Sequence, residues 1–307
     1  MVHSFDDKNS IADSLILMNA ADEKVMTKKA PKQTPAIQIG GDDRLFVLTG
    51  AGVSAESGLA TFRGADGLWH GHRVEDVASP EAWERDPELV WNFYSMRRKK
   101  ASTVRPNPAH RALAQLEREL GERFFLCTQN VDHLHERAGS KRLVHMHGEL
   151  FQSRCESCDS EPFADENLYE SLAAIPRCRC GARIRPNIVW FGETIFHLPR
   201  IAQELQRCTV LLAVGTSGLV QPAASFVQWV GSNRVPSRAA VAHDGQSRER
   251  AEGAGIRTYY VGPEKPANSS AFTDIFLGKA GELLPSLFKV QDSVSAGKVR
   301  EKPKRSS

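Results

Sequence analysis

The sequence predicts an α/β protein in which a doubly wound parallel sheet carries a small inserted metal-binding module. Three observations support this fold class. Short apolar runs alternate with amphipathic stretches, a Gly-Ala-Gly turn follows the first strong apolar run, and four cysteines cluster in the one segment that breaks the alternation. Strands that are apolar along their whole length are typical of a parallel sheet covered on both faces.

The expected strands and helices follow from local signals. Apolar, β-branched or aromatic runs predict strands over residues 44–49, 123–128, 209–214, 238–242 and 257–261. Asn107-Pro108 predicts the start of a helix that Gly121 ends, because a capping side chain followed by proline suits a first helical turn. Asp86-Pro87 begins a second helix in the same way, running towards Lys100.

The composition of the chain disfavours some classes of binding partner. The formal charge is +3 over 307 residues, which does not favour nucleic acid or a membrane surface. No apolar run reaches a bilayer-spanning length, and no secretory signal is visible. We therefore expect a cytoplasmic monomer. We expect a flexible N-terminal extension (1–39), a catalytic domain (40–290) with a zinc-binding insertion at 150–181, and a basic disordered tail (291–307).

The clustered cysteines predict one structural zinc ion. Cys155 and Cys158 are two residues apart, and Cys178 and Cys180 form a second, tighter pair. Two short-spaced pairs present four thiolates, which is the tetrahedral set that Zn²⁺ prefers. Because protein ligands fill all four positions, the ion is expected to stabilise the fold and to take no part in catalysis. Cys127 and Cys208 are expected to be buried apolar residues in strands.

The glycine-rich turn is a candidate phosphate-binding loop. It comprises Gly50, Ala51, Gly52, Ser54 and Ala55. Small residues at this place let backbone N–H groups approach a phosphate. The spacing departs from G-x-G-x-x-G, so a simple tight turn remains an equal alternative at this point.

The turn is the first of several motifs that occur in a fixed order. They are GAGVSAESG from Gly50, TFRG from Thr61, TQNVD from Thr128, His147-Gly148, the four cysteines, RPNIVWFGE from Arg185, and GTS from Gly215. This ordered set resembles the sirtuin family of NAD-dependent protein lysine deacylases over about residues 40 to 290. The resemblance implies a Rossmann-like domain and a small zinc domain, with NAD and an acylated lysine side chain meeting between them.

The resemblance also implies site residues. The cofactor-binding set would be Gly50, Ala51, Gly52, Ser54, Ala55, Phe62, Arg63, Trp69, Gln129, Asn130, Val131, Asp132, Gly215, Thr216, Ser217, His243 and Ala280. Substrate peptide would add as a β-strand beside Phe191, Gly192, Glu193 and Val220.

His147 would be the catalytic base that activates a ribose hydroxyl, a task that suits imidazole, with its unperturbed pKa of ~6.5. The sequence departs from the usual pattern at Ala60, His133, His145 and His243. His145 lies close enough to compete with His147 for the role of base. We assign the role to His147 because it precedes Gly148.

A last motif concerns the acyl group. Tyr94 and Arg97 share one face of the helix expected after Asp86, and they resemble the pair that marks sirtuins acting on acidic acyl groups. A guanidinium and a phenol suit the carboxylate of a succinyl or malonyl group. The neighbouring Arg98, Lys99 and Lys100 leave open an ordinary basic helix face.

Other functions remain as alternatives. They are deacetylation without preference for acidic acyl groups, mono-ADP-ribosyl transfer to protein, and a non-catalytic binding module. A zinc-ribbon nucleic-acid binder is disfavoured, because the cysteine segment is rich in acidic residues.

Overall fold

The computed structural model describes residues 37–61, 71–231 and 255–291, and all of them belong to one compact unit that begins at Ala36. The other residues include the predicted strand at 238–242 and four predicted cofactor residues, Phe62, Arg63, Trp69 and His243. These predictions lie outside the described residues.

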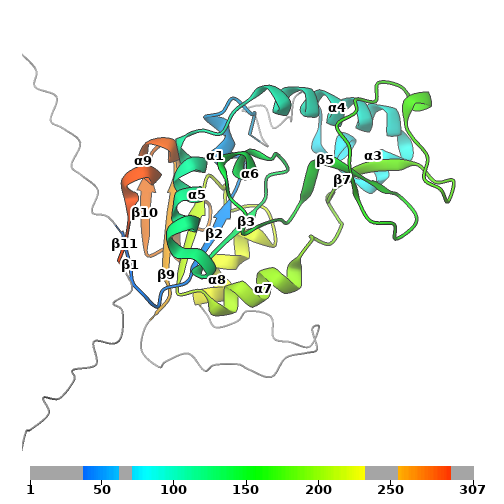
Figure 1. Cartoon of the computed structure of the whole chain (residues 1–307). Helices are drawn as coiled ribbons and strands as arrows, with labels where there is room; N and C mark the ends of the chain where they lie inside the picture. The colour runs from blue at the N-terminus through cyan, green and yellow to red at the C-terminus, as the bar shows by residue number, and fades with distance from the viewer. Residues whose placement is uncertain (1–36, 62–70, 232–254, 292–307) are drawn as a thin grey trace, which may run out of the picture. The chain divides into compact units, whose positions relative to one another are not determined.

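A six-stranded sheet forms the centre of the larger part of this unit, and all its strand pairs are parallel (Figure 1). In sheet order the strands are β10 (Asp274–Leu277), β9 (Arg257–Gly262), β8 (Val210–Val214), β2 (Leu45–Thr49), β3 (Phe124–Thr128) and β4 (Leu143–His145). The four inner strands confirm the apolar runs read from the sequence. The two edge strands were not predicted, because they are short and partly exposed, with no more than three apolar residues in a row.

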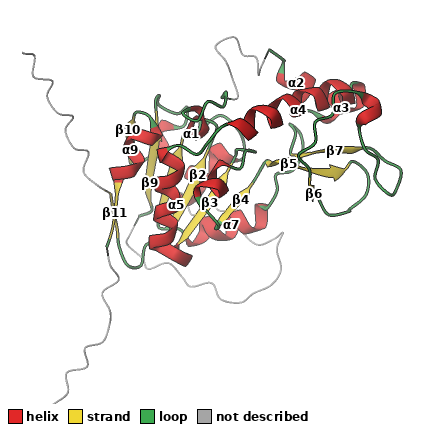
Figure 2. Ribbon diagram, turned by 45° about the horizontal axis from the view of Figure 1, so that its top comes forward, coloured by secondary structure: helices red, strands yellow, loops and turns green. Residues whose placement is uncertain are grey.

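Helices cover both faces of this sheet, as Figure 2 shows. In β2, Leu45 and Val47 face one hydrophobic cluster, while Phe46 and Leu48 face another. Successive side chains of a strand point to opposite faces, so one apolar run fills two cores. The first cluster is closed by α5 (Pro108–Leu120) and α9 (Ala280–Leu287), and the second by α7 (Leu198–Arg207) and α8 (Phe226–Gly231). The predicted doubly wound α/β fold is confirmed.

Both helix starts predicted from Asx-Pro pairs are present. Asn107 caps α5 by accepting from the N–H groups of Ala109 and His110, and Gly121, at φ 57°, follows its last residue. Asp86 caps α4 (Pro87–Thr103) by accepting from Leu89 N, and this helix ends three residues beyond the expected Lys100.

A third hydrophobic cluster lies around a three-stranded antiparallel sheet. This sheet has the order β6 (Phe163–Ala164), β5 (Gly148–Cys155) and β7 (Ile184–Ile188). The cluster combines residues of this sheet with residues of α2 (Val74–Val77), α3 (Pro80–Arg85) and α4. One expectation is wrong, because this sheet extends beyond the expected 150–181. Helix α4 packs in this module.

Two smaller corrections concern the ends of elements. Residues 37–39, expected in a flexible extension, form β1 (Ile37–Ile39), which pairs in parallel with β11 (Phe288–Val290). Cys208, expected in a strand, instead follows the last residue of α7, although it is buried as expected.

Within the described ranges, no helix combines the length and apolar character needed to cross a bilayer.

Candidate active site

Four neighbouring strands deliver the predicted cofactor residues to one edge of the parallel sheet. The turn from Gly50 follows β2, the segment from Gln129 follows β3, His147 follows β4, and Gly215 follows β8. In the sheet, β3 lies on one side of β2 and β8 lies on the other, so the strand order reverses its direction at β2. Open α/β sheets bind ligands at such a switch point, outside the carboxyl ends of the strands.

Glycines let the β2 and β8 turns touch through their backbones. Gly52 N donates to Gly215 O at 2.9 Å, and Gly50 N donates to Val214 O at 2.9 Å. A Cβ at Gly52 would lie 2.8 Å from Gly215 Cα, and a Cβ at Gly215 would lie 2.5 Å from Val53 N. We expected these glycines to free N–H groups for a phosphate. In the structure the N–H groups of Gly50 and Gly52 already join the two turns.

Buried polar side chains connect the β2 turn to the segment after β3. Ser54 Oγ donates to Asp132 Oδ2 at 3.0 Å and accepts from Asn130 Nδ2 at 3.1 Å. Burial raises the pKa of Asp132, and hydrogen bonds from Leu134 N and Ser54 offset part of this shift. Gln129 Nε2 donates to Thr216 Oγ1 at 3.1 Å, which extends the connection to β8. The turn residues brought together in this way can surround one ligand.

The two histidines at the end of β4 have different hydrogen bonds. His145 Nδ1 lies 2.7 Å from Asn130 O and its Nε2 lies 2.6 Å from Glu136 Oε1, so both ring nitrogens face acceptors. Burial alone would lower the pKa of His145, but the hydrogen bond and charge of Glu136 outweigh it and raise the pKa. A ring that donates from both nitrogens cannot accept a proton.

His147 is arranged as a base. Its Nδ1 lies 3.1 Å from Gln129 O, which fixes the tautomer with the proton on Nδ1 and leaves Nε2 as an acceptor. Burial lowers the pKa of His147, and the hydrogen bond to Gln129 offsets part of this shift. The imidazole is therefore neutral at pH 7, as a general base must be before it acts.

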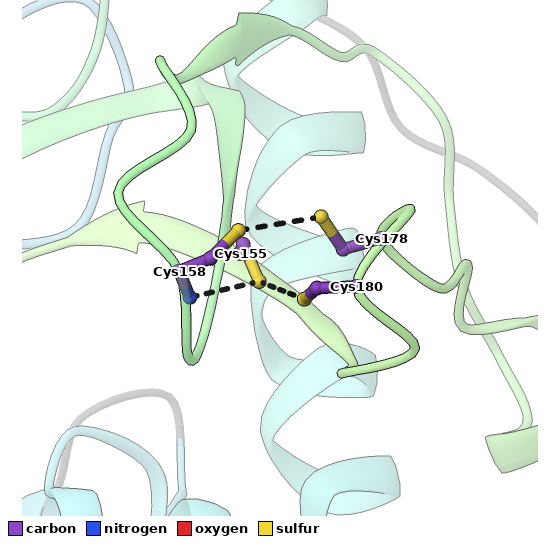
Figure 3. A group of neighbouring side chains, drawn as sticks. All are labelled: Cys155, Cys158, Cys178 and Cys180. Atoms are coloured by element: carbon purple, nitrogen blue, oxygen red, sulfur yellow. Dashed lines mark hydrogen bonds between the residues drawn. The ribbon is translucent and has the colours of Figure 1, made fainter.

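The four cysteines converge in the antiparallel module (Figure 3). Cys155 ends β5, and its Sγ lies 3.5 Å from Cys180 Sγ, while Cys158 Sγ lies 3.6 Å from Cys178 Sγ. All four sulfur atoms lie within 4.8 Å of one another. Sulfur atoms about 2.3 Å from a tetrahedral zinc are roughly 3.8 Å apart, so the cluster fits the ion without rearrangement of the backbone.

Tyr94 and Arg97 lie together on α4. Arg97 Cζ lies 5.7 Å from the centroid of the Tyr94 ring, and the Tyr94 hydroxyl accepts from Trp190 Nε1 at 3.1 Å. Burial raises the pKa of Tyr94 to about 12, so the phenol stays protonated. Arg97 also borders a hollow of about 270 Å³ with Gly58 and Ala60, at the start of the predicted cofactor loop.

The neighbouring basic residues behave differently. Arg98 is 1% exposed, pairs with Asp165 at 3.3 Å and donates to Leu150 O at 2.8 Å. It therefore joins α4 to the antiparallel sheet. Lys99 and Lys100 are exposed. Of this basic run, Arg97 alone combines partial burial with a place beside Tyr94.

The expected peptide-binding segments lie on loops, with large apolar side chains exposed. Phe191 is 49% and Leu219 is 57% exposed. Phe191 N already donates to Ala78 O, and Glu193 N to Trp190 O. The Glu193 carboxylate pairs with Arg185 at 2.7 Å. An added peptide strand would therefore pair with the backbone carbonyl groups and with Gly192 N. Glu193 would contribute only its carbonyl group, because its N–H and its carboxylate are already engaged. Val220 is half-buried just beyond Leu219.

Three of the predicted cofactor residues make only a few contacts in the structure. Ser217 accepts from Leu219 N at 3.4 Å, and Val131 O accepts from Leu150 N. Ala280 is buried at the start of α9, whose Gly281 N donates to Glu56 beside the β2 turn. Sequence reasoning missed the His145–Glu136 pair and the support that Trp190 gives to Tyr94, because neither has a fixed sequence spacing.

These features define an α/β protein with a dinucleotide-type switch point, a histidine at its edge and a four-thiolate module. A model of the Sir2 family matches residues 50–222. An NAD-dependent protein deacylase of Shewanella oneidensis is 43% identical over 260 residues, covering 83% of this chain and 96% of that protein. The chain belongs to the Sir2 family.

Solved structures agree with this assignment. The structure of a Sir2 homologue in complex with NAD is 40% identical, has a TM-score of 0.66, and is matched over 79% of this chain and 87% of that one. A structure of Sir2 bound to an acetylated peptide is 25% identical, with a TM-score of 0.61, over 78% of this chain and 90% of the other.

Proposed function

We propose that this protein is an NAD-dependent protein lysine deacylase that prefers acyl groups ending in a carboxylate. The observation that carries the first part is His147, whose Nδ1 is held by Gln129 O and whose Nε2 is left as an acceptor at the switch-point edge. The naming of the Shewanella relative as an NAD-dependent protein deacylase supports the same activity.

The residues at the edge fit a dinucleotide. The Gly50–Ala55 turn and Gly215–Ser217 would hold its phosphates and adenosine side, and Asn130 and Asp132 would bind the nicotinamide ribose. NAD would supply the ADP-ribose that accepts the acyl group. His147 would take a proton from a ribose hydroxyl at Nε2, and Gln129 O would hold the ring while it becomes charged. Asp132 and Asn130, anchored to Ser54, would keep their orientation during this step.

The second part of the proposal rests on Tyr94 and Arg97. The Tyr94 oxygen accepts from Trp190, so its own proton remains available for an acyl carboxylate. Arg97 offers a guanidinium that can bind the same carboxylate through two parallel hydrogen bonds. In a half-buried place an unpaired carboxylate is costly, so a fixed cation and a neutral donor favour an acidic acyl group over an acetyl group.

Arg97→Met tests the acyl preference. Because hydrogen bonds to a charged group contribute ~1.5–3 kcal/mol, we expect kcat/KM for succinyl- and malonyl-lysine peptides to fall by roughly tenfold to a hundredfold. Activity on acetyl-lysine should survive or rise. The matched control is Lys99→Met, which removes a charge from an exposed position two residues away and should alter neither activity. An equal loss of both activities in Arg97→Met would mean that this residue supports the fold and does not read the acyl group.

We further propose that the protein acts as a monomer in the cytoplasm, on proteins and not on nucleic acid. A four-cysteine zinc site requires reduced thiols, which favours a reducing compartment.

A mono-ADP-ribosyltransferase would use the same NAD-binding edge. Two features favour deacylation over it: the acceptor nitrogen of His147 and the Tyr94–Arg97 pair, which ADP-ribosyl transfer to protein does not require.

A further inference from the structure

We propose that His133, Glu136 and Glu149 form a second metal site, which binds a divalent transition ion such as Zn²⁺ and is separate from the four cysteines. The ligand atoms of these three side chains all lie within 4.8 Å of one another. Among the described residues, this is the only group besides the cysteines with such an arrangement. This proposal does not depend on the deacylase activity.

The donor set suits the ion. Imidazole nitrogen and carboxylate oxygen are both zinc ligands, with bonds of about 2.0–2.2 Å, and water can complete the coordination of a site with three protein ligands. His133 Nε2 already lies 3.1 Å from Glu149 Oε2. Ligand atoms around one ion lie roughly 3–4 Å apart, so a side-chain movement of about 1 Å would close the site.

Glu136 carries the second, independent observation. Its Oε1 is held by His145 Nε2 at 2.6 Å, which fixes the direction of the carboxylate. Its Oε2 is buried and has no hydrogen-bond partner among the described residues. The Glu136 side chain as a whole is 35% exposed and borders a hollow, so a cation could reach it and, shared with His133 and Glu149, would give this oxygen a partner. Carboxylates that bind a metal are commonly held by a further hydrogen bond, as His145 holds Glu136.

The surroundings give the ion access and charge. His133 and Glu136 border a hollow of about 430 Å³ that is also lined by Phe151, Glu166 and Arg137. Three carboxylates, those of Glu136, Glu149 and Glu166, face two cationic groups, Arg137 and the doubly donating His145. The carboxylates outnumber these two cationic groups, so an arriving cation would offset negative charge.

The site would join two parts of the chain. Glu136 lies in α6 (Leu134–Ala138), just after the segment that carries Asn130 and Asp132, while Glu149 lies in β5, two residues after His147. An ion bound here would tie together the segments that carry the proposed NAD and base residues. It should therefore stabilise the folded protein by mass action.

Calorimetric titration of Zn²⁺ into the enzyme that retains its cysteine-bound zinc tests the proposal. We expect one additional equivalent to bind, and the unfolding temperature to rise with Zn²⁺. His133→Asn and Glu149→Gln should each weaken this binding by at least about tenfold and remove the rise. The control Glu119→Gln, at an exposed position on α5, should leave both unchanged.

Two results would overturn the proposal. One is the absence of an additional equivalent in the wild-type enzyme. The other is an additional equivalent that binds equally well in His133→Asn and Glu149→Gln, since the ion would then be held elsewhere. Circular dichroism of each variant before titration shows whether it is folded, and two variants in different elements guard against a local folding defect in one of them.

Discussion

The imidazoles of His145 and His147 point their ring nitrogens at different partners, and this difference decides which one can act as a base. Both nitrogens of His145 face acceptors, Asn130 O and Glu136 Oε1. His147 uses only Nδ1, on Gln129 O. The sequence assigned the role of base to His147 from its place before Gly148, and the carbonyl and carboxylate groups that the fold brings to each ring give the physical reason.

We expect His147→Ala to lower kcat of deacylation by about 10²- to 10⁴-fold, because a positioned base contributes that factor. The unfolding temperature should change little, since His147 makes one hydrogen bond at a partly exposed position. His145→Gln is the comparison, and it should lower stability more than it lowers kcat, because a buried pair with Glu136 is lost. Full activity in His147→Ala, with none in a folded His145→Gln, would reverse the assignment.

At the scale of elements, the two cysteine pairs hold the loops around β5 and β7. We expect Cys178→Ser to lose the bound zinc and to unfold the antiparallel module, since structural zinc contributes directly to folding. The control is Cys208→Ser, a buried cysteine whose Sγ donates to Leu205 O and which lies outside the cluster. Zinc is measured by elemental analysis after a wash with EDTA, which removes weakly bound ions. Full zinc content in Cys178→Ser would contradict the assignment of this ligand.

The start of α5 carries a pH-sensitive element. His110 accepts from Asn107 N in the capping box, and burial lowers the pKa of His110 to about 4. The unfolded chain would take up a proton near pH 6.5 while the folded chain would not, so stability falls as pH decreases from about 6.5 to about 4.

Between pH 7.5 and 5.0, this group should cost the wild-type protein about 2 kcal/mol of unfolding free energy. His110→Asn keeps a capping acceptor and removes the titration, so the loss over this interval should be smaller by about that amount. Urea unfolding of both proteins at the two pH values measures the difference, and the zinc site contributes equally to both. If the wild-type protein and His110→Asn lost equal amounts of unfolding free energy between these pH values, His110 would not titrate as described.

At the scale of the whole molecule, the central sheet could be predicted from sequence because its four inner strands are apolar on both faces, as in β2 and β8. The edge strands β4 and β10 lack this signal. The sheet on which α4 packs was not predicted, because a helical pattern does not say which sheet the helix contacts. Its Trp91 and Tyr94 join the core of the antiparallel module, a contact between residues far apart in sequence.

The candidate site was predictable for a related reason. Turns after neighbouring parallel strands meet at one edge, so Gly50, Gln129 and Gly215 converge once the strand order is known. The supporting partners were not predictable, because Ser54–Asp132 and Trp190–Tyr94 join residues 78 and 96 positions apart. The prediction for Arg98 was ambiguous from sequence, and its burial against Asp165 separates it from Arg97.

Product analysis with NAD and succinyl-lysine peptide tests the proposed deacylase activity most directly. Mass spectrometry should find free nicotinamide, deacylated peptide and O-succinyl-ADP-ribose in equal amounts, and water supplies the remaining atoms. Acetyl-lysine peptide should give the corresponding products more slowly, and His147→Ala should give almost none. Peptide or protein carrying ADP-ribose, with the acyl group still on lysine, would contradict the proposed deacylase function.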